Sequence, residues 1–199
     1  MAQKLNRLRE TASQTAGPYV HIGLMPTHAG NGGYYDEEFG TSAFEDGASG
    51  EIIEIAGSVY DGVGYALRDA LLESWQADSS GRFAGEDGAD PKVSGFCRFA
   101  ADAESGEFML RTVKPGAVRH RSGAFQAPHI ALWIVARGIN IGLQTRIYFD
   151  DEDNTADPIL ARIEYRPRVE TLIAKKTGAG KYRFDIRLQG EGETVFLDM

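Results

Sequence analysis

The sequence predicts a mainly β protein, a two-sheet antiparallel β-sandwich with an extended N-terminal arm and one short helix near the C-terminus. Three observations support this class: many short apolar runs, 24 glycines placed between them, and only one segment with clear helical spacing. A chain of 199 residues is expected to form one domain, with residues 1–50 as arm and loops and residues 51–199 as the core.

The first 50 residues show little regular periodicity. A short helical turn is expected at residues 5–10. Residues 13–24 (SQTAGPYVHIGL) and the glycine-rich residues 31–50 are typical of extended chain and loops. An arm of this kind loses entropy when it becomes ordered, so it is expected to lie on a surface.

Strands are expected wherever apolar and polar residues alternate. Residues 51–61 place Ile53 and Ile55 on one face, and residues 65–77 are expected to form a second strand. Residues 95–116 are predicted to form a hairpin that turns at 104–106 and places Phe108 and Leu110 on one face. Trp75 and Trp133 are expected to anchor the core.

The second half of the chain contains the most apolar run. Residues 129–136 are almost continuously apolar, which is typical of a central strand covered on both faces. Residues 144–149 and the alternating residues 182–188 are further strands. Residues 168–176 follow Pro167, carry apolar residues at helical spacing and end in lysines, so a helix is expected there.

Charge and cysteine content narrow the class of protein. The net charge of −8 argues against binding to nucleic acid or to an anionic membrane. No apolar run reaches the ~18 residues that a membrane span requires, and the N-terminus lacks the apolar segment of a secretory signal. A single cysteine, Cys97, excludes an internal disulfide and fits a reducing cytoplasm.

His129 is half of a possible metal-binding pair. Side chains repeat with period two along a strand, so an H-x-H segment would direct two imidazoles at one ion. Here the second position is Ala131. The competing interpretation of His129 is an ordinary core histidine that donates to a carbonyl group.

The other candidate metal ligands have simpler interpretations. His21, His28 and His120 are scattered and are expected at the surface or an interface. The acidic residues 150–153 lack the ligand spacing of a calcium loop and are expected to be a solvated loop. Residues 178–183 (GAGKYR) follow the predicted helix and do not form a phosphate-binding loop.

Five segments, taken in order, resemble the intradiol ring-cleavage dioxygenases. They are I-A-G-S-V-Y-D-G-V-G (55–64), L-L-E-S-W-Q-A-D (71–78), T-V-K-P-G (112–116), A-P-H-I (127–130) and Y-R-F-D-I-R-L-Q-G (182–190). They cover nearly all of the chain after residue 51. Residues 13–24 and 136–141 are most similar to the iron-free chain of the family's heteromeric members.

The resemblance implies a ferric ion held by two tyrosines and two histidines, which suits a hard cation. At the four matching positions this chain has Phe83, Val118, His129 and Ala131. Where the active chain carries an arginine before the first histidine, this chain has Gln126. Three of the four ligand positions therefore cannot bind a metal, and these are vestigial positions.

The resemblance also implies a partner, a homologous β chain that holds the ferric ion, in a higher-order αβ oligomer. The catalytic pocket would lie between the two chains, with Thr15, Gly17, Pro18, Tyr19 and Arg137 contributed from this side. The Gly-Pro backbone can approach a ligand closely, and a guanidinium could bind a substrate carboxylate. The alternative for Arg137 is an ordinary ion-paired residue at a strand end.

The leading hypothesis is an iron-free subunit of an intradiol dioxygenase. Its complex would cleave protocatechuate (3,4-dihydroxybenzoate) with O2 to 3-carboxy-cis,cis-muconate. The alternative is a metal-free sandwich that acts as a binding or scaffolding module, although residues 13–24 and 136–141 would then have no pocket to line. A third possibility, an independent metalloenzyme with relocated ligands, has only four scattered histidines to draw on.

Overall fold

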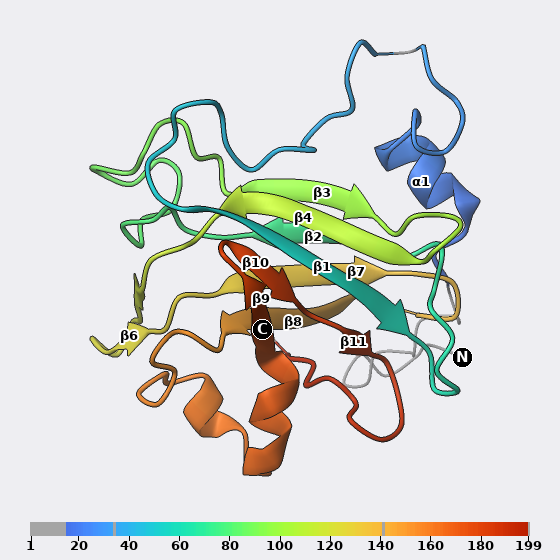
Figure 1. Ribbon diagram of the computed structural model, residues 1–199. Coiled ribbons are helices and arrows are strands. Elements are labelled where there is room, and N and C mark those ends of the chain that lie inside the picture. Colours follow the sequence, from blue (N-terminus) through green and yellow to red (C-terminus); the bar gives the residue numbers. More distant parts are fainter. Residues whose placement is uncertain (1–14, 34, 141, 199) are drawn as a thin grey trace, which may run out of the picture.

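The computed structural model describes residues 15–33, 35–140 and 142–198, so the turn expected at residues 5–10 lies outside the described part. The described chain is mainly β, as expected (Figure 1). Its elements are α1 (Pro18–Leu24), β1 (Ile52–Tyr60), β2 (Leu71–Trp75), β3 (Phe96–Ala100), β4 (Glu107–Val113), β5 (Val118–Arg119), β6 (Phe125–Gln126), β7 (Ile130–Val135), β8 (Leu143–Phe149), η1 (Leu160–Arg162), η2 (Arg166–Leu172), β9 (Ile173–Gly178), β10 (Lys181–Arg183) and β11 (Ile186–Arg187).

In the described part of the chain, nine strands form a mixed sheet, and β5 and β6 form a separate antiparallel pair, so the expectation of a purely antiparallel arrangement was wrong. The hydrogen-bonded order is β11-β1-β10-β9-β8-β7-β2-β3, and β4 pairs with β1 outside this path. Strand β1 is antiparallel to β4 but parallel to β10 and β11, and β8 is parallel to β9. The parallel pairs arise because the segments between these strands cross the molecule instead of forming tight turns.

One hydrophobic core collects side chains from strands all along this path, which is consistent with a sandwich. The fully buried residues include Ile53, Ile55, Leu72, Leu110, Leu132, Ile134, Ile147, Phe149 and Ile186. Strand β7 is central, as predicted, because it pairs with β2 on one side and with β8 on the other.

Strand β1 has the inward-facing side chains that its alternation predicts, and Gly57 among them has a specific steric role. A Cβ atom at position 57 would collide with the carbonyl oxygen of Phe184 and with the ring of Phe108. The amide of Phe184 also donates to Ala56 at 2.9 Å. Glycine is therefore required here for β1 to lie against the C-terminal strands.

The hairpin predicted at residues 95–116 is not paired with itself. Strand β3 pairs with β2, whereas β4 pairs with β1, so the turn between them carries the chain from one part of the sheet to another. The carboxylate of Asp102 accepts from the amide of Ser105 at 2.7 Å and shapes this turn. The rings of Phe99 and Phe108 then pack together at 5.6 Å, and Phe108 and Leu110 share the buried face as expected.

The second strand is shorter than the predicted residues 65–77. Asp61 accepts from the amides of Val63 and Tyr65, both at 2.9 Å, so the turn extends further and pairing begins only at Leu71. Trp75 was expected in the core, but it is 46% exposed on the outer face of the sheet.

The helix predicted at residues 168–176 was also wrong in part. A 3-10 helix ends at Leu172, and the chain continues directly into strand β9. Ile173 and Ala174 pair in parallel with Tyr148 and Phe149 of β8. Pairing with an existing strand therefore overrides the helical spacing of this segment.

The N-terminal arm contains a helix where extended chain was expected. Pro18 occupies the first turn of α1, where its missing amide hydrogen costs nothing. Val20 and Leu24 pack on Leu71 and Val135, so the helix covers one end of the β2–β7 surface. Figure 1 shows α1 (blue) and the 3-10 segments (orange) on opposite sides of the strands.

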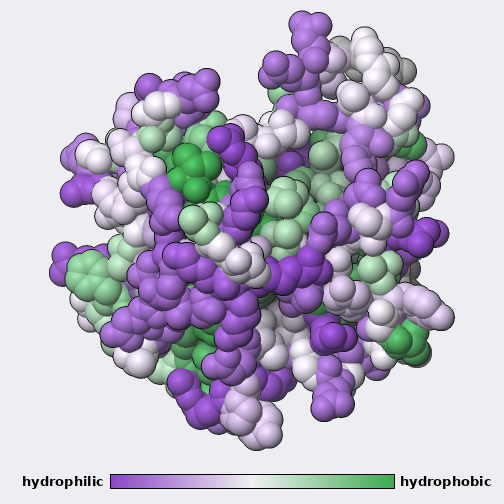
Figure 2. Space-filling view, viewed as in Figure 1, coloured by the Kyte–Doolittle hydropathy of each residue, from purple (hydrophilic) through white to green (hydrophobic). Residues whose placement is uncertain are grey.

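The surface on the side shown in Figure 1 is largely hydrophilic. Figure 2 shows hydrophobic residues there only as separate patches among hydrophilic ones. Within the described ranges, no helix combines the length and the apolar character needed to cross a membrane.

Candidate functional site at the α1 cavity

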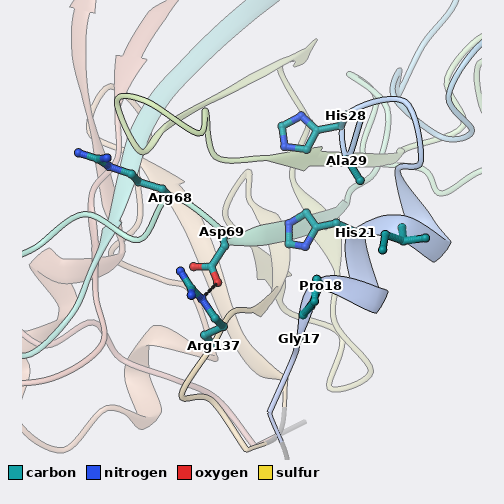
Figure 3. Close-up of a pocket in the computed structure, with 9 residues that line it drawn as sticks. Gly17, Pro18, His21, His28, Ala29, Arg68, Asp69 and Arg137 are labelled. Atoms are coloured by element: carbon teal, nitrogen blue, oxygen red, sulfur yellow. Dashed lines mark hydrogen bonds and ion pairs between the residues drawn. The ribbon is translucent and has the colours of Figure 1, made fainter. Parts of the chain in front are cut away.

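A cavity of about 370 Å³ lies where α1 meets the sheet (Figure 3). It brings together three of the predicted site residues, the adjacent Gly17 and Pro18 and, more than 100 positions later in the sequence, Arg137. The remaining lining residues are His21, Ile22, His28, Ala29, Arg68 and Asp69.

The strand register explains why these residues meet. Leu71 of β2 is paired with Val135 of β7 in an antiparallel ladder. Asp69 lies two residues before Leu71, and Arg137 lies two residues after Val135. The pairing of β2 with β7 therefore brings both residues to the same end of these two strands. There the two side chains form an ion pair between Asp69 and Nε of Arg137.

Thr15 holds the N-terminal arm at the same end of these strands through a hydrogen bond, although it does not line the cavity. Its hydroxyl accepts from the amide of Gly138 at 2.8 Å. Tyr19, the remaining predicted residue, is 85% exposed and is not among the cavity-lining side chains. The predicted set thus falls into three cavity-lining residues, one fastening residue and one outward-facing tyrosine.

The cavity wall is locally positive on a chain whose net charge is −8. Two arginines and one aspartate line it, together with two histidines. The ion pair expected in the alternative interpretation of Arg137 is present, but the Arg137 side chain is 73% exposed, so this pair contributes little to stability. Such a wall is suited to an anionic ligand.

The sequence did not predict Asp69 as a site residue, and it predicted His21 only as a surface or interface residue. The antiparallel register of residues 71–75 with residues 131–135 would have indicated Asp69 opposite Arg137, but that pairing was not predicted. His28 is exposed, as expected, whereas His21 is half-buried. Burial, followed by the neighbouring His28, lowers the pKa of His21, and Asp69 opposes this shift.

The vestigial positions lie around the other end of β7, and His129 is a core residue there. It is only 5% exposed, and its Nδ1 donates to the carbonyl of Ala127 at 2.8 Å. Burial, assisted by the charge of Arg146, lowers the pKa of His129 to about 4. The imidazole is therefore neutral at pH 7.

A protein cation lies among the vestigial positions. Arg146 of β8 is paired across the ladder with Ala131, and its Nη1 donates to Gln126 at 2.7 Å. Gln126 is in turn paired with Val118. The guanidinium thus binds Gln126, while Ala131 and Val118 lie opposite Arg146 and Gln126 in the two strand pairs.

The donor atoms at these positions do not fit a ferric ion. Val118 and Ala131 carry no ligand atom, and Phe83 lacks the phenolate oxygen. Its ring instead stacks on Trp75, with centroids 6.3 Å apart and an angle of 5° between the planes. Within the described residues, no group of three or more His, Cys, Asp or Glu side chains is arranged to hold a metal ion.

The acidic loop at residues 150–153 is tied down by lysines. Asp151 pairs with Lys114 at 3.1 Å and with Lys176 at 2.8 Å. These partners, together with Tyr182, lower the pKa of Asp151 to about 2 against the opposing effect of burial. The loop is mostly exposed, as expected, and its carboxylates serve ion pairs.

The fold is that of a dioxygenase. A family model described as "Dioxygenase" matches residues 26–190, and the chain belongs to the intradiol dioxygenase family.

Three known proteins show what the chain is similar to. It is 50% identical to the "Protocatechuate 3,4-dioxygenase alpha chain" of Pseudomonas putida, over 96% of this chain and 97% of that protein. It is 30% identical to the "Protocatechuate 3,4-dioxygenase beta chain" of Burkholderia cepacia, over 81% and 75% of the two chains. The solved 3-chlorocatechol 1,2-dioxygenase of Rhodococcus opacus 1CP shares the fold, with a TM-score of 0.57 and 22% identity over 74% of this chain and 63% of that one.

Proposed function

We propose that this chain is the iron-free α subunit of a heteromeric intradiol dioxygenase that converts protocatechuate and O2 to 3-carboxy-cis,cis-muconate. The observation that carries the proposal is the contrast within one chain. Gly17, Pro18 and Arg137 meet in an open cavity, whereas the vestigial positions offer one buried imidazole and no phenolate. The relatives at 50% and 30% identity support both the activity and the heteromer.

The partner is a homologous β chain that supplies the ferric ion. The bound ion would provide the chemistry that makes the catecholate reactive towards O2. The cavity at α1 is open in the single chain, which is consistent with a pocket that the second chain completes. The complex is assigned to the cytoplasm, which suits Cys97, a buried thiol whose pKa burial raises to about 11.

This chain's own residues would hold the substrate. Arg137 offers a permanent positive charge to the ring carboxylate, with its Nε already held by Asp69. Gly17 and Pro18 would line the site with backbone that can approach the ring closely. Thr15 keeps this backbone against the strand end through Gly138.

Expression of the chain alone and with its β partner tests the division of labour. Co-expression is expected to yield a coloured, iron-containing complex that consumes O2 with protocatechuate, whereas the chain alone yields no iron. A homo-oligomer of this chain that holds iron and cleaves protocatechuate by itself would contradict the proposal. A stable chain that forms no complex with the β partner would favour the binding-module alternative.

A further inference from the structure

His21 contains a buried polar atom that has no hydrogen-bond partner. Its Nε2 is inaccessible to solvent and makes no hydrogen bond to any described residue. A buried polar group in this state is destabilising, and such atoms often mark the place of a missing ligand contact. His21 lines the same cavity as Arg137, so the side chain that carries this unpaired atom borders the proposed substrate site.

The cavity places the His21 ring opposite the charged pair. Figure 3 shows the ring extending from α1 towards Asp69 and Arg137, while the side chain of Arg68 points away from them. The influence of Asp69 on the His21 pKa also indicates that the two side chains are close. His28 stacks beside His21, with ring centroids 6.0 Å apart.

The protonation state of His21 suits hydrogen-bond donation without added charge. Burial and His28 lower its pKa, so the ring is neutral at pH 7. A neutral imidazole carries one N–H, which Nε2 can present. A carboxylate accepts hydrogen bonds and donates none, and it is therefore the complementary ligand.

We propose that His21 is a substrate-binding residue that donates from Nε2 to the carboxylate of the dihydroxybenzoate bound by Arg137. This inference rests on the proposed function of the cavity. Asp69 offsets part of the Arg137 charge, so a second donor on the opposite wall would fix the orientation of the carboxylate. Two donors from different elements define the plane of the carboxylate better than one.

The test compares two amides at position 21 in the co-expressed complex. In His21→Gln the side-chain amide nitrogen lies near the original Nε2. In His21→Asn the side chain is one bond shorter, so its amide nitrogen lies closer to the backbone. We expect His21→Asn to raise KM for protocatechuate about tenfold, which corresponds to about 1.4 kcal/mol, with kcat within twofold. His21→Gln should stay within threefold of the wild type, and His120→Asn, at a histidine that does not line this cavity, is the matched control.

Catechol provides the second readout because it lacks the carboxylate. Its KM should be the same in the wild type and in His21→Asn. Equal KM values for the Gln and Asn variants, or an equal rise for both substrates, would overturn the inference. If Arg137→Ala raises KM for protocatechuate while His21→Asn does not, only the role of His21 fails; if neither does, the proposed substrate site fails with it.

Discussion

The two ends of β7 have opposite characters. At the start of the strand, His129 is buried, neutral and bonded to Ala127. Beyond its other end, Arg137 is exposed and charged, and it borders an open cavity. One strand of six residues thus separates a buried imidazole (the closed end) from an exposed guanidinium (the open end), and a second cavity of about 550 Å³ lies beside Gln126 and Pro128, next to the buried imidazole.

The difference shows how catalytic and binding roles can separate within one fold. In the proposed function, the metal chemistry depends on a few ligand atoms, and the side chains of Val118 and Ala131 carry none. The cavity depends instead on the placement of backbone and charge by α1 and the β2–β7 ladder. It therefore persists in a chain whose vestigial positions no longer fit a metal.

The largest effect is expected at the closed end, from protonation of His129. Its pKa falls from 6.5 to about 4 in the folded chain, so the unfolded chain binds the proton more tightly. Stability is therefore fully present above pH 6.5 and is lost as the pH falls towards 4, by about 3 kcal/mol. Urea unfolding of the complex across this range should show a weaker pH dependence in His129→Gln.

The same variant tests whether the closed end is structural. His28→Gln, at an exposed histidine, serves as the control and should retain the wild-type pH dependence. Iron content of the complex should be unchanged in both variants. A fall in iron in His129→Gln would show that this end of β7 still takes part in metal binding.

At the open end, Arg137→Ala should raise KM for protocatechuate by about tenfold to a hundredfold, because a charged hydrogen bond contributes about 1.5–3 kcal/mol. Iron content should not change. Arg68→Ala is the matched comparison and should raise KM less, since this arginine lines the same cavity but points away from the Asp69–Arg137 pair (Figure 3). Steady-state kinetics on the purified complexes provide the measurement, and an unaltered KM would remove Arg137 from the site.

Periodicity predicted the parts of the fold that local sequence controls. The alternation of β1 and the apolar run of β7 gave correct strands because both segments bury one or both faces. The helix expected after Pro167 failed at Ile173, where pairing with Tyr148 is a long-range effect that spacing does not record. Trp75 likewise shares the face of Leu71, but α1 covers that face only near Leu71, which spacing along the chain does not record.

The candidate site was predicted only as far as the resemblance reached. Gly17, Pro18 and Arg137 were expected and lie together, whereas Asp69 and the inward orientation of His21 were not expected. Both depend on strand register and on helix packing, which bring distant residues together. These arrangements require the folded structure.

The smallest effect is expected at Asp69, which both orients Arg137 and offsets its charge. Asp69→Asn keeps an acceptor for Nε of Arg137 but removes the negative charge beside the substrate carboxylate. KM for protocatechuate should therefore fall about threefold at low salt, and the gain should shrink at high salt. Asp69→Ala, the control, also removes the acceptor and should show no such gain. A higher KM in the asparagine variant would mean that the charge of Asp69 is needed to keep Arg137 in place. The orientation of Arg137 would then depend on the ion pair, although its side chain is exposed.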